Sequence, residues 1–191
     1  MTEALGLKKF PEFISLEEER EIVSFIQEQM EFVPKTSKNK VLNYGTKRRS
    51  FDLIVKPIPP CIDKIGLRIF NQGLTASHPD SLSVIEMLPG NSICRHVNSV
   101  ENGKVITVLN MNTVANMRFQ KDQVLRGDLA DRRPVAEDTP FTEEMIVQIE
   151  PRTVTQMSGE IRTFWSHSIL PVENKRYSIV YRCLPSRILY L

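Results

Sequence analysis

The feature that most constrains the fold of this chain is a change in sequence pattern near residue 80. Helical spacing of apolar residues precedes it, and a series of short β segments bounded by turn residues follows it. We expect strands over 81–88, 93–97, 104–111, 114–119, 145–149, 153–157, 162–169 and 177–183. Two helices followed by a run of antiparallel strands indicate an α+β fold, with the sheets forming a sandwich or jelly-roll (double-stranded β-helix) core.

Two helices are expected before the strands, packed on one sheet. Ser15-Leu16-Glu17-Glu18 is a capping box, and apolar residues at helical spacing follow it, which predicts a helix over about 15–30. Prolines introduce a second helix over about 60–72, which Gly73 ends. We expect extended segments and turns over 35–57 and a long loop over 122–143.

The length predicts a single domain over 1–191, with a helical part at about 12–75, a jelly-roll core at about 81–183 and a tail at 184–191. Hydrophobic and charged contents of 41% and 25% are typical of soluble proteins. No apolar run approaches the ~18 residues of a membrane span. Three widely spaced cysteines without a CxxC pair favour a reducing compartment, the cytoplasm or the nucleus.

His96, Asn98 and His167 nearly form an iron site. The facial triad of non-haem Fe(II) oxygenases uses two histidines and one carboxylate, as His-x-Asp and a distant His. His96 and Asn98 leave the same face of a strand because they are two residues apart. A jelly roll is expected to bring His167 toward them from a facing strand. An amide nevertheless stands where the carboxylate is expected.

Further motifs accompany these residues in a fixed order. Pro89-Gly90 precedes His96-Val97-Asn98, and a regular strand and Met117-Arg118-Phe119 follow. Gly159-Glu160-Ile161-Arg162 then leads to His167, and Arg176 and Arg182 stand six residues apart. In this order the motifs resemble the AlkB family of Fe(II)/2-oxoglutarate dioxygenases. The resemblance covers about residues 12 to 183.

The resemblance implies roles for individual positions. His96 and His167 match the iron-binding histidines, Arg176 matches the arginine that pairs with the distal carboxylate of 2-oxoglutarate, and Arg182 matches the second arginine near the metal. Asn98 replaces the iron-binding Asp, and Ile85 and Met87 replace an Asn-x-Tyr pair that contacts 2-oxoglutarate. These losses favour a non-catalytic protein without a cofactor, in which the arginines and histidines persist as core residues.

The resemblance also implies a binding surface, because the family acts mostly on nucleic acids and proteins. Its basic loops at the barrel mouth correspond here to 35–56, the densest basic segment, where Tyr44 and Phe51 are candidates to stack on bases. We therefore expect RNA or a ribonucleoprotein such as the ribosome as the partner. The candidate contacts are Lys35, Lys38, Lys40, Lys47, Arg48, Arg49, Arg118 and Lys121.

Two alternatives stay open. The first is an active dioxygenase acting on RNA or protein, which would use Fe(II) and 2-oxoglutarate with Asn98 as a weak ligand or deamidated to Asp. The second is a protein-interaction adaptor that uses the barrel and the tail 184–191. The oligomeric state stays undetermined.

Overall fold

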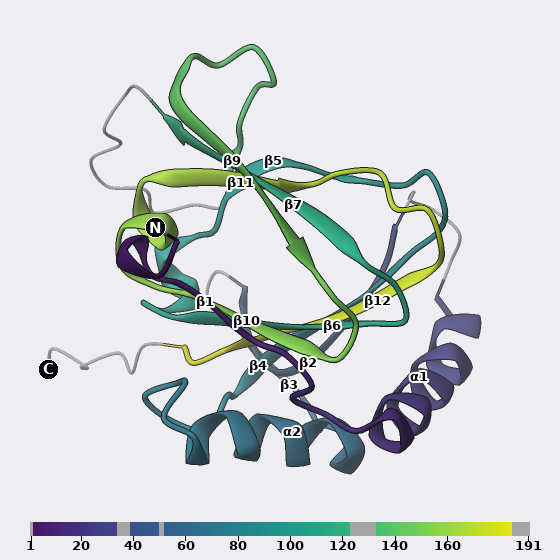
Figure 1. The fold of residues 1–191 in the computed structure, drawn as a ribbon. Helices are drawn as coiled ribbons and strands as arrows, with labels where there is room; N and C mark the ends of the chain where they lie inside the picture. The colour runs from purple at the N-terminus through teal and green to yellow at the C-terminus, as the bar shows by residue number, and fades with distance from the viewer. Residues whose placement is uncertain (1, 34–38, 50–51, 123–132, 185–191) are drawn as a thin grey trace, which may run out of the picture.

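Two antiparallel sheets face each other in the computed structural model, which describes residues 2–33, 39–49, 52–122 and 133–184 (Figure 1). In these residues the larger sheet has seven strands in the order β1-β10-β6-β12-β4-β2-β3. Their bounds are β1 Leu7–Phe10, β10 Thr153–Met157, β6 Ile106–Met111, β12 Arg176–Arg182, β4 Ser81–Met87, β2 Asn39–Arg49 and β3 Asp52–Lys56. This architecture confirms the predicted α+β jelly roll.

The smaller sheet has five strands in the order β8-β5-β11-β7-β9. These strands are β8 Arg133–Pro134, β5 Ile93–Val97, β11 Trp165–Ile169, β7 Ala115–Asp122 and β9 Phe141–Ile149. A short helical turn, η1 (Glu3–Leu5), precedes β1, and two more, η2 (Val100–Asn102) and α3 (Gly159–Thr163), lie between strands. None of the helices in the described residues is long and apolar enough to cross a membrane.

Helices α1 (Leu16–Glu31) and α2 (Pro60–Asn71) cover the outer face of the larger sheet (Figure 1). The predicted capping box starts α1, because the Ser15 hydroxyl accepts from the Glu18 amide at 3.2 Å and the Ser15 amide donates to the Glu18 carboxylate at 3.0 Å. Gly73, at a φ of +70°, follows α2 as expected. Arg68 on α2 donates two hydrogen bonds to Glu18 and lowers the pKa of that carboxyl group.

The central strand β12 of the larger sheet has side chains on both faces of the sheet, and the two faces differ in chemistry. Along β12, the side chains of Tyr177, Ile179 and Tyr181 join the core under the helices. The alternate residues Arg176, Ser178, Val180 and Arg182 line the space between the sheets. The helix-facing side is thus apolar and the inner side is mixed, since successive strand residues point to opposite faces.

Several predicted strands end close to where the structure ends them, and two expectations need correction, whereas the extended segments expected over 35–57 are present. The segment 162–169 begins inside helix α3 and becomes extended only in β11. The predicted loop over 122–143 contains β8 and the start of β9. The extended residues in 35–57 are paired as a hairpin of β2 and β3 at the sheet edge.

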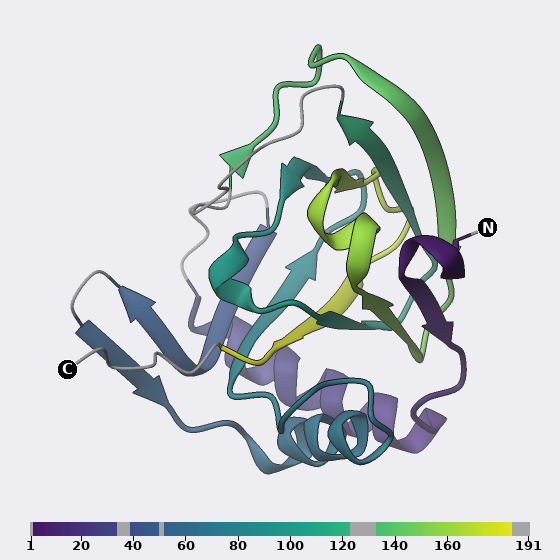
Figure 2. The same ribbon diagram turned by 90° about the vertical axis from the view of Figure 1, so that its left-hand side faces the viewer.

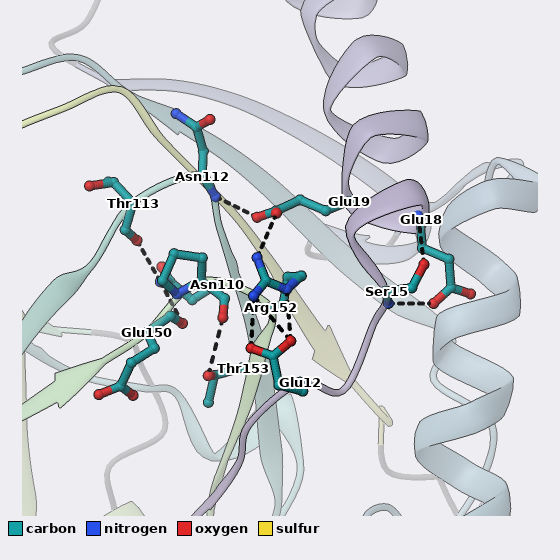
Figure 3. A network of polar contacts seen from close by, with 11 residues as sticks. Glu12, Ser15, Glu18, Glu19, Asn110, Asn112, Thr113, Glu150, Arg152 and Thr153 are labelled. Atoms are coloured by element: carbon teal, nitrogen blue, oxygen red, sulfur yellow. Dashed lines mark hydrogen bonds and ion pairs between the residues drawn. The ribbon is translucent and has the colours of Figure 1, made fainter.

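A network of ion pairs joins α1 to the turn between β9 and β10 (Figure 3). Arg152, at a φ of 60°, donates to both carboxylate oxygens of Glu12 at 2.8 and 3.0 Å and lies 3.4 Å from Glu19. The other oxygen of the buried Glu19 accepts from the Asn112 amide at 2.7 Å. Glu19 therefore links helix α1 to two turns, one at Asn112 and one at Arg152.

We predict that Glu19→Ala lowers the free energy of unfolding by about 2 kcal/mol, because it leaves the Asn112 amide and Arg152 without their shared carboxylate. Urea unfolding measures this loss. Glu28→Ala is the matched control, since Glu28 is exposed on the same helix and its loss should stay within about 0.5 kcal/mol. Equal effects of the two substitutions would show that the network does not hold α1 to the sheet.

Candidate functional site

His96 and His167 lie directly opposite each other on the paired strands β5 and β11. Their ring centroids are 4.3 Å apart, and both side chains are buried. The expectation of facing strands was wrong, because the two histidines are neighbours in the smaller sheet. Antiparallel pairing places them side by side on one face of that sheet, where they line the space between the sheets.

Asn98 completes the cluster just beyond the end of β5. Its Nδ2 atom lies 3.1 Å from Nε2 of His167, and its side chain is buried. The amide and the imidazole lie within hydrogen-bonding distance, and the direction of the bond follows the tautomer of His167. His96 Nδ1 lies 2.9 Å from the Cys94 carbonyl oxygen and therefore donates to it. The two predicted histidines and Asn98 thus converge in one cluster.

The cluster does not fit Fe(II). Hard divalent cations favour carboxylate oxygens, whereas this site offers two imidazoles and an amide. The Asn98 side chain, which carries no charge, lies 3.1 Å from His167 Nε2. Among the described residues, no three His, Cys, Asp or Glu side chains are grouped so that they could hold a metal ion.

Arg162 of α3 fixes the backbone that carries Asn98. Its Nη1 atom donates to the Asn98 carbonyl oxygen at 3.0 Å, and its Nη2 atom donates to the carbonyl oxygens of Ser99 at 2.6 Å and Gly103 at 3.0 Å. Burial lowers the pKa of this guanidinium. The loop from Asn98 to Gly103 is thus held by a buried cation on neutral acceptors, which agrees with the expectation that some inner arginines bind backbone.

Arg176 is the most buried of the candidate cofactor residues, at 2% exposed. Its Nε atom donates to Asn110 Oδ1 at 2.7 Å, and its Nη1 atom contacts Ser178 Oγ at 3.2 Å and Met87 Sδ at 3.3 Å. Burial alone lowers its pKa, to about 10. The side chain therefore stays charged at neutral pH, in contact with neutral groups.

Asn110 was not predicted to belong to the site. Its Nδ2 atom donates to the carbonyl oxygens of Thr113, Ile149 and Glu150 at 2.8 to 3.2 Å, which leaves Oδ1 directed to Arg176. Figure 3 shows Asn110 beside Thr113. In the sequence, the signal that could have pointed to Asn110 is a single amide after the mainly apolar residues 105–109.

A cavity of about 1140 Å³ lies between the sheets and joins these groups. His96, Asn98, His167, Arg176 and Arg182 all line it, as does Ile85. Arg182 donates to Ser83 Oγ at 2.9 Å, and Ser83 donates to Asn43 Oδ1 at 2.8 Å. The candidate metal and cofactor residues therefore share one cavity.

The predicted nucleic-acid contacts that the structure describes lie on β2 of the larger sheet and β7 of the smaller one. Lys47, Arg48 and Arg49 end strand β2, while Lys35, Lys38 and Phe51 lie outside the described residues. Tyr44 is buried in the core under the helices, so it is not available to stack on a base.

Three candidate cations are already paired with protein groups. Lys40 Nζ donates to the Met30 carbonyl at 2.8 Å and lies 3.8 Å from Glu86. Arg118 Nε lies 3.9 Å from Glu144, and Lys121 Nζ lies 3.0 Å from Glu143 and 2.9 Å from Glu160. The structure therefore shows these three side chains in contact with groups of the protein itself.

Comparison with known proteins supports the fold. No protein-family model matches the sequence, and no curated protein gives a significant match. The structure of OsALKBH1 matches with a TM-score of 0.61 and 13% identity, over 93% of this chain and 98% of that one. A Pseudomonas putida prolyl-4-hydroxylase matches with a TM-score of 0.58 and 13% identity, over 96% of each chain. Both are Fe/2-oxoglutarate dioxygenase-fold proteins, so the AlkB-like resemblance is confirmed at the level of the fold.

We predict that Asn98→Asp raises the affinity for Co(II) or Mn(II) by roughly tenfold or more, because a carboxylate would complete two imidazoles that already converge. Calorimetric titration of the metal into wild type and variant measures the difference. Asn98→Asp combined with His167→Ala is the matched control and should remove the gain. Equal metal affinity of wild type and Asn98→Asp would contradict the assignment of Asn98 as the defect in the cluster.

Proposed function

We propose that this protein is a non-catalytic jelly roll of the 2-oxoglutarate dioxygenase type that binds RNA or a ribonucleoprotein such as the ribosome. The observation that carries the non-catalytic part is the 3.1 Å contact between Asn98 Nδ2 and His167 Nε2. That contact puts a neutral amide beside the imidazole, at the position of the third ligand.

The opposite wall of the cavity supports the same conclusion. In the resemblance to the AlkB family, Ile85 and Met87 stand where polar groups contact the co-substrate. Here they are paired in register with Ser178 and Arg176, and Met87 is fully buried with its sulfur against the guanidinium. An isoleucine and a thioether offer no hydrogen-bond donor to a carboxylate, so these two positions do not supply the polar contacts of the family.

The proposed RNA contact is the hairpin of β2 and β3. Lys47, Arg48 and Arg49 are consecutive at the end of β2, and β3 is the outermost strand of the larger sheet. Figure 2 shows this hairpin extending away from the body of the molecule. Consecutive cations on a projecting edge suit phosphate contacts, which are independent of sequence.

The proposal includes Lys35 and Lys38, which belong to the same basic segment. It gives less weight to Lys40, Arg118 and Lys121, because each is paired with protein groups. A partner of this kind places the protein in the cytoplasm or the nucleus.

An active dioxygenase is the second candidate. The observations that favour it are the opposed histidines and a buried arginine in the same cavity. The adaptor hypothesis gains no such support, since residues 185–191 of the tail lie outside the described residues.

We predict that Lys47→Glu, Arg48→Glu and Arg49→Glu together weaken binding to single-stranded RNA by at least about tenfold and reduce the slope of log K against log salt by about 2. Fluorescence anisotropy at several salt concentrations measures both. The triple variant Lys8→Glu, Arg20→Glu and Lys104→Glu is the control, because it changes net charge equally at exposed positions elsewhere. Equal weakening in both variants would refute the hairpin as the binding surface.

We further predict that the wild-type protein does not convert 2-oxoglutarate to succinate above background with Fe(II), with or without RNA. The reason is the absence of a carboxylate ligand in the cluster. Succinate is quantified by mass spectrometry, and an active 2-oxoglutarate oxygenase assayed in parallel sets the sensitivity. Succinate formation that His96→Ala abolishes would establish the dioxygenase instead.

A further inference from the structure

Strand β9 forms one edge of the smaller sheet, and among the described residues it pairs only with β7. In Figure 2 it is the long green strand along the outer side of the molecule. A strand at a sheet edge presents a row of N–H and C=O groups with which a further strand can pair. The edge of β9 is therefore a surface on which an extended chain can add to the sheet.

The backbone groups of β7 that point away from β9 identify the groups of β9 that point to its free edge. The carbonyl oxygens of Asn116 and Gln120 accept from the Leu170 amide and the Ser166 hydroxyl, both at 3.0 Å, on the side of β11. In an antiparallel pair, two residues opposite each other either both direct their backbone groups to the partner strand or both direct them away. The β9 residues opposite Asn116 and Gln120 therefore direct theirs to the free edge.

These residues are Gln148 and Glu144, and the unbroken register between them places Ile146 in the same set. Lys9 agrees with this assignment, because its Nζ atom donates to the Gln148 carbonyl oxygen at 2.9 Å from the side of β1. Lys9 thus covers one end of the edge. The N–H and C=O groups of Glu144 and Ile146 are directed to a side on which no described strand pairs with them.

The other three edges of the described sheets are protected, whereas β9 is not. Strand β8 has two residues, one of them Pro134, and β1 has four, two of them lysines. Strand β3 belongs to the hairpin with β2 and ends at Lys56. Short strands, prolines and lysines are the usual means by which a protein keeps an edge from pairing. Strand β9 has nine residues with no proline and no basic residue, and its Ile146 is 53% exposed.

The sequence of β9 fits a second copy of itself in antiparallel orientation, with the twofold axis at Ile146. Each Ile146 then lies opposite its copy, and Met145 lies opposite Val147, so the centre of the pair is apolar. Glu144 lies opposite Gln148, whose neutral amide can donate to the carboxylate. In this register the residues that direct their backbone groups to the edge face one another, and each such pair exchanges two hydrogen bonds.

The neighbouring registers fit less well. An axis at Met145 places Glu144 opposite Ile146, an acid against an apolar side chain. An axis at Glu144 places the two copies of that carboxylate opposite each other, and an axis at Val147 places Glu144 opposite Glu150. Like charges directly opposite each other destabilise a strand pair. The register centred on Ile146 is therefore the one that β9 favours.

We propose that two copies of this chain pair through β9, antiparallel and centred on Ile146, so that the two smaller sheets become one continuous sheet with five strands from each copy. A second copy suits this edge better than a flexible peptide, because its β9 is already ordered as a strand and pairing costs little conformational entropy. The inference goes beyond RNA binding and does not depend on it, and separate assays test the two proposals.

Sedimentation velocity of the purified full chain without RNA tests the proposal. The sedimentation coefficient should rise from that of a monomer to that of a dimer between about 1 and 300 μM protein. Amide hydrogen exchange gives a second readout, because the N–H groups of Glu144 and Ile146 should exchange at least about tenfold more slowly in the dimer. A monomer over the whole range, or exchange in β9 that does not depend on protein concentration, would overturn the proposal.

Two exposed apolar residues provide matched variants. Ile146→Lys preserves the fold, because the side chain is exposed, and it places two ammonium groups opposite each other at the axis. It should weaken the dimer by at least about tenfold. Phe32→Lys introduces the same charge just after α1, where the side chain is 84% exposed, and should dimerise like the wild type. A dimer that Ile146→Lys leaves unchanged, or that Phe32→Lys weakens equally, would refute pairing through β9.

Discussion

The interaction on which this structure most depends is the packing of α1 and α2 against one face of the larger sheet. The helices pack against every second residue of its central strands. Tyr177, Ile179 and Tyr181 of β12 therefore belong to the apolar core under the helices. The layer between the helices and the larger sheet buries these apolar side chains. The inner face of the same strands is thereby free to carry Arg176, Ser178 and Arg182 around a cavity. A jelly roll whose core lay only between its sheets would have no room for such polar residues.

The three inner arginines show how differently one residue type is used inside a barrel. Arg162 donates hydrogen bonds to three backbone carbonyl oxygens and so positions the loop that carries Asn98. Arg182 joins a neutral network through Ser83. Arg176 contacts the side chains of Asn110, Ser178 and Met87 and lines the cavity. The hydrogen-bond partners of the three side chains distinguish these roles. Burial does not, because both Arg162 and Arg176 are buried.

Much of the architecture was predictable because local signals agreed with the fold. The capping box of α1 and the glycine after α2 act within one or two turns of chain, so the sequence specifies them directly. The failures have physical causes. The last two residues of α3, Arg162 and Thr163, were predicted as strand, because a helix of five residues is too short for helical periodicity to emerge. The first half of β9 is exposed at a sheet edge, and polar residues there look like a loop.

By itself, the sequence determined the chemistry that the site lacks. An amide at position 98 and apolar residues at 85 and 87 remove a carboxylate ligand and polar contacts, whichever way the chain folds. Only the tertiary structure decided what these residues do instead. It brought the Asn98 amide within hydrogen-bonding distance of His167 Nε2, and it directed Lys40 to the carbonyl oxygen of Met30 on helix α1. It also left Arg176 among neutral groups, with Asn110 as its partner. Residue identity sets which bonds are possible, whereas long-range pairing of strands sets which groups come within bonding distance.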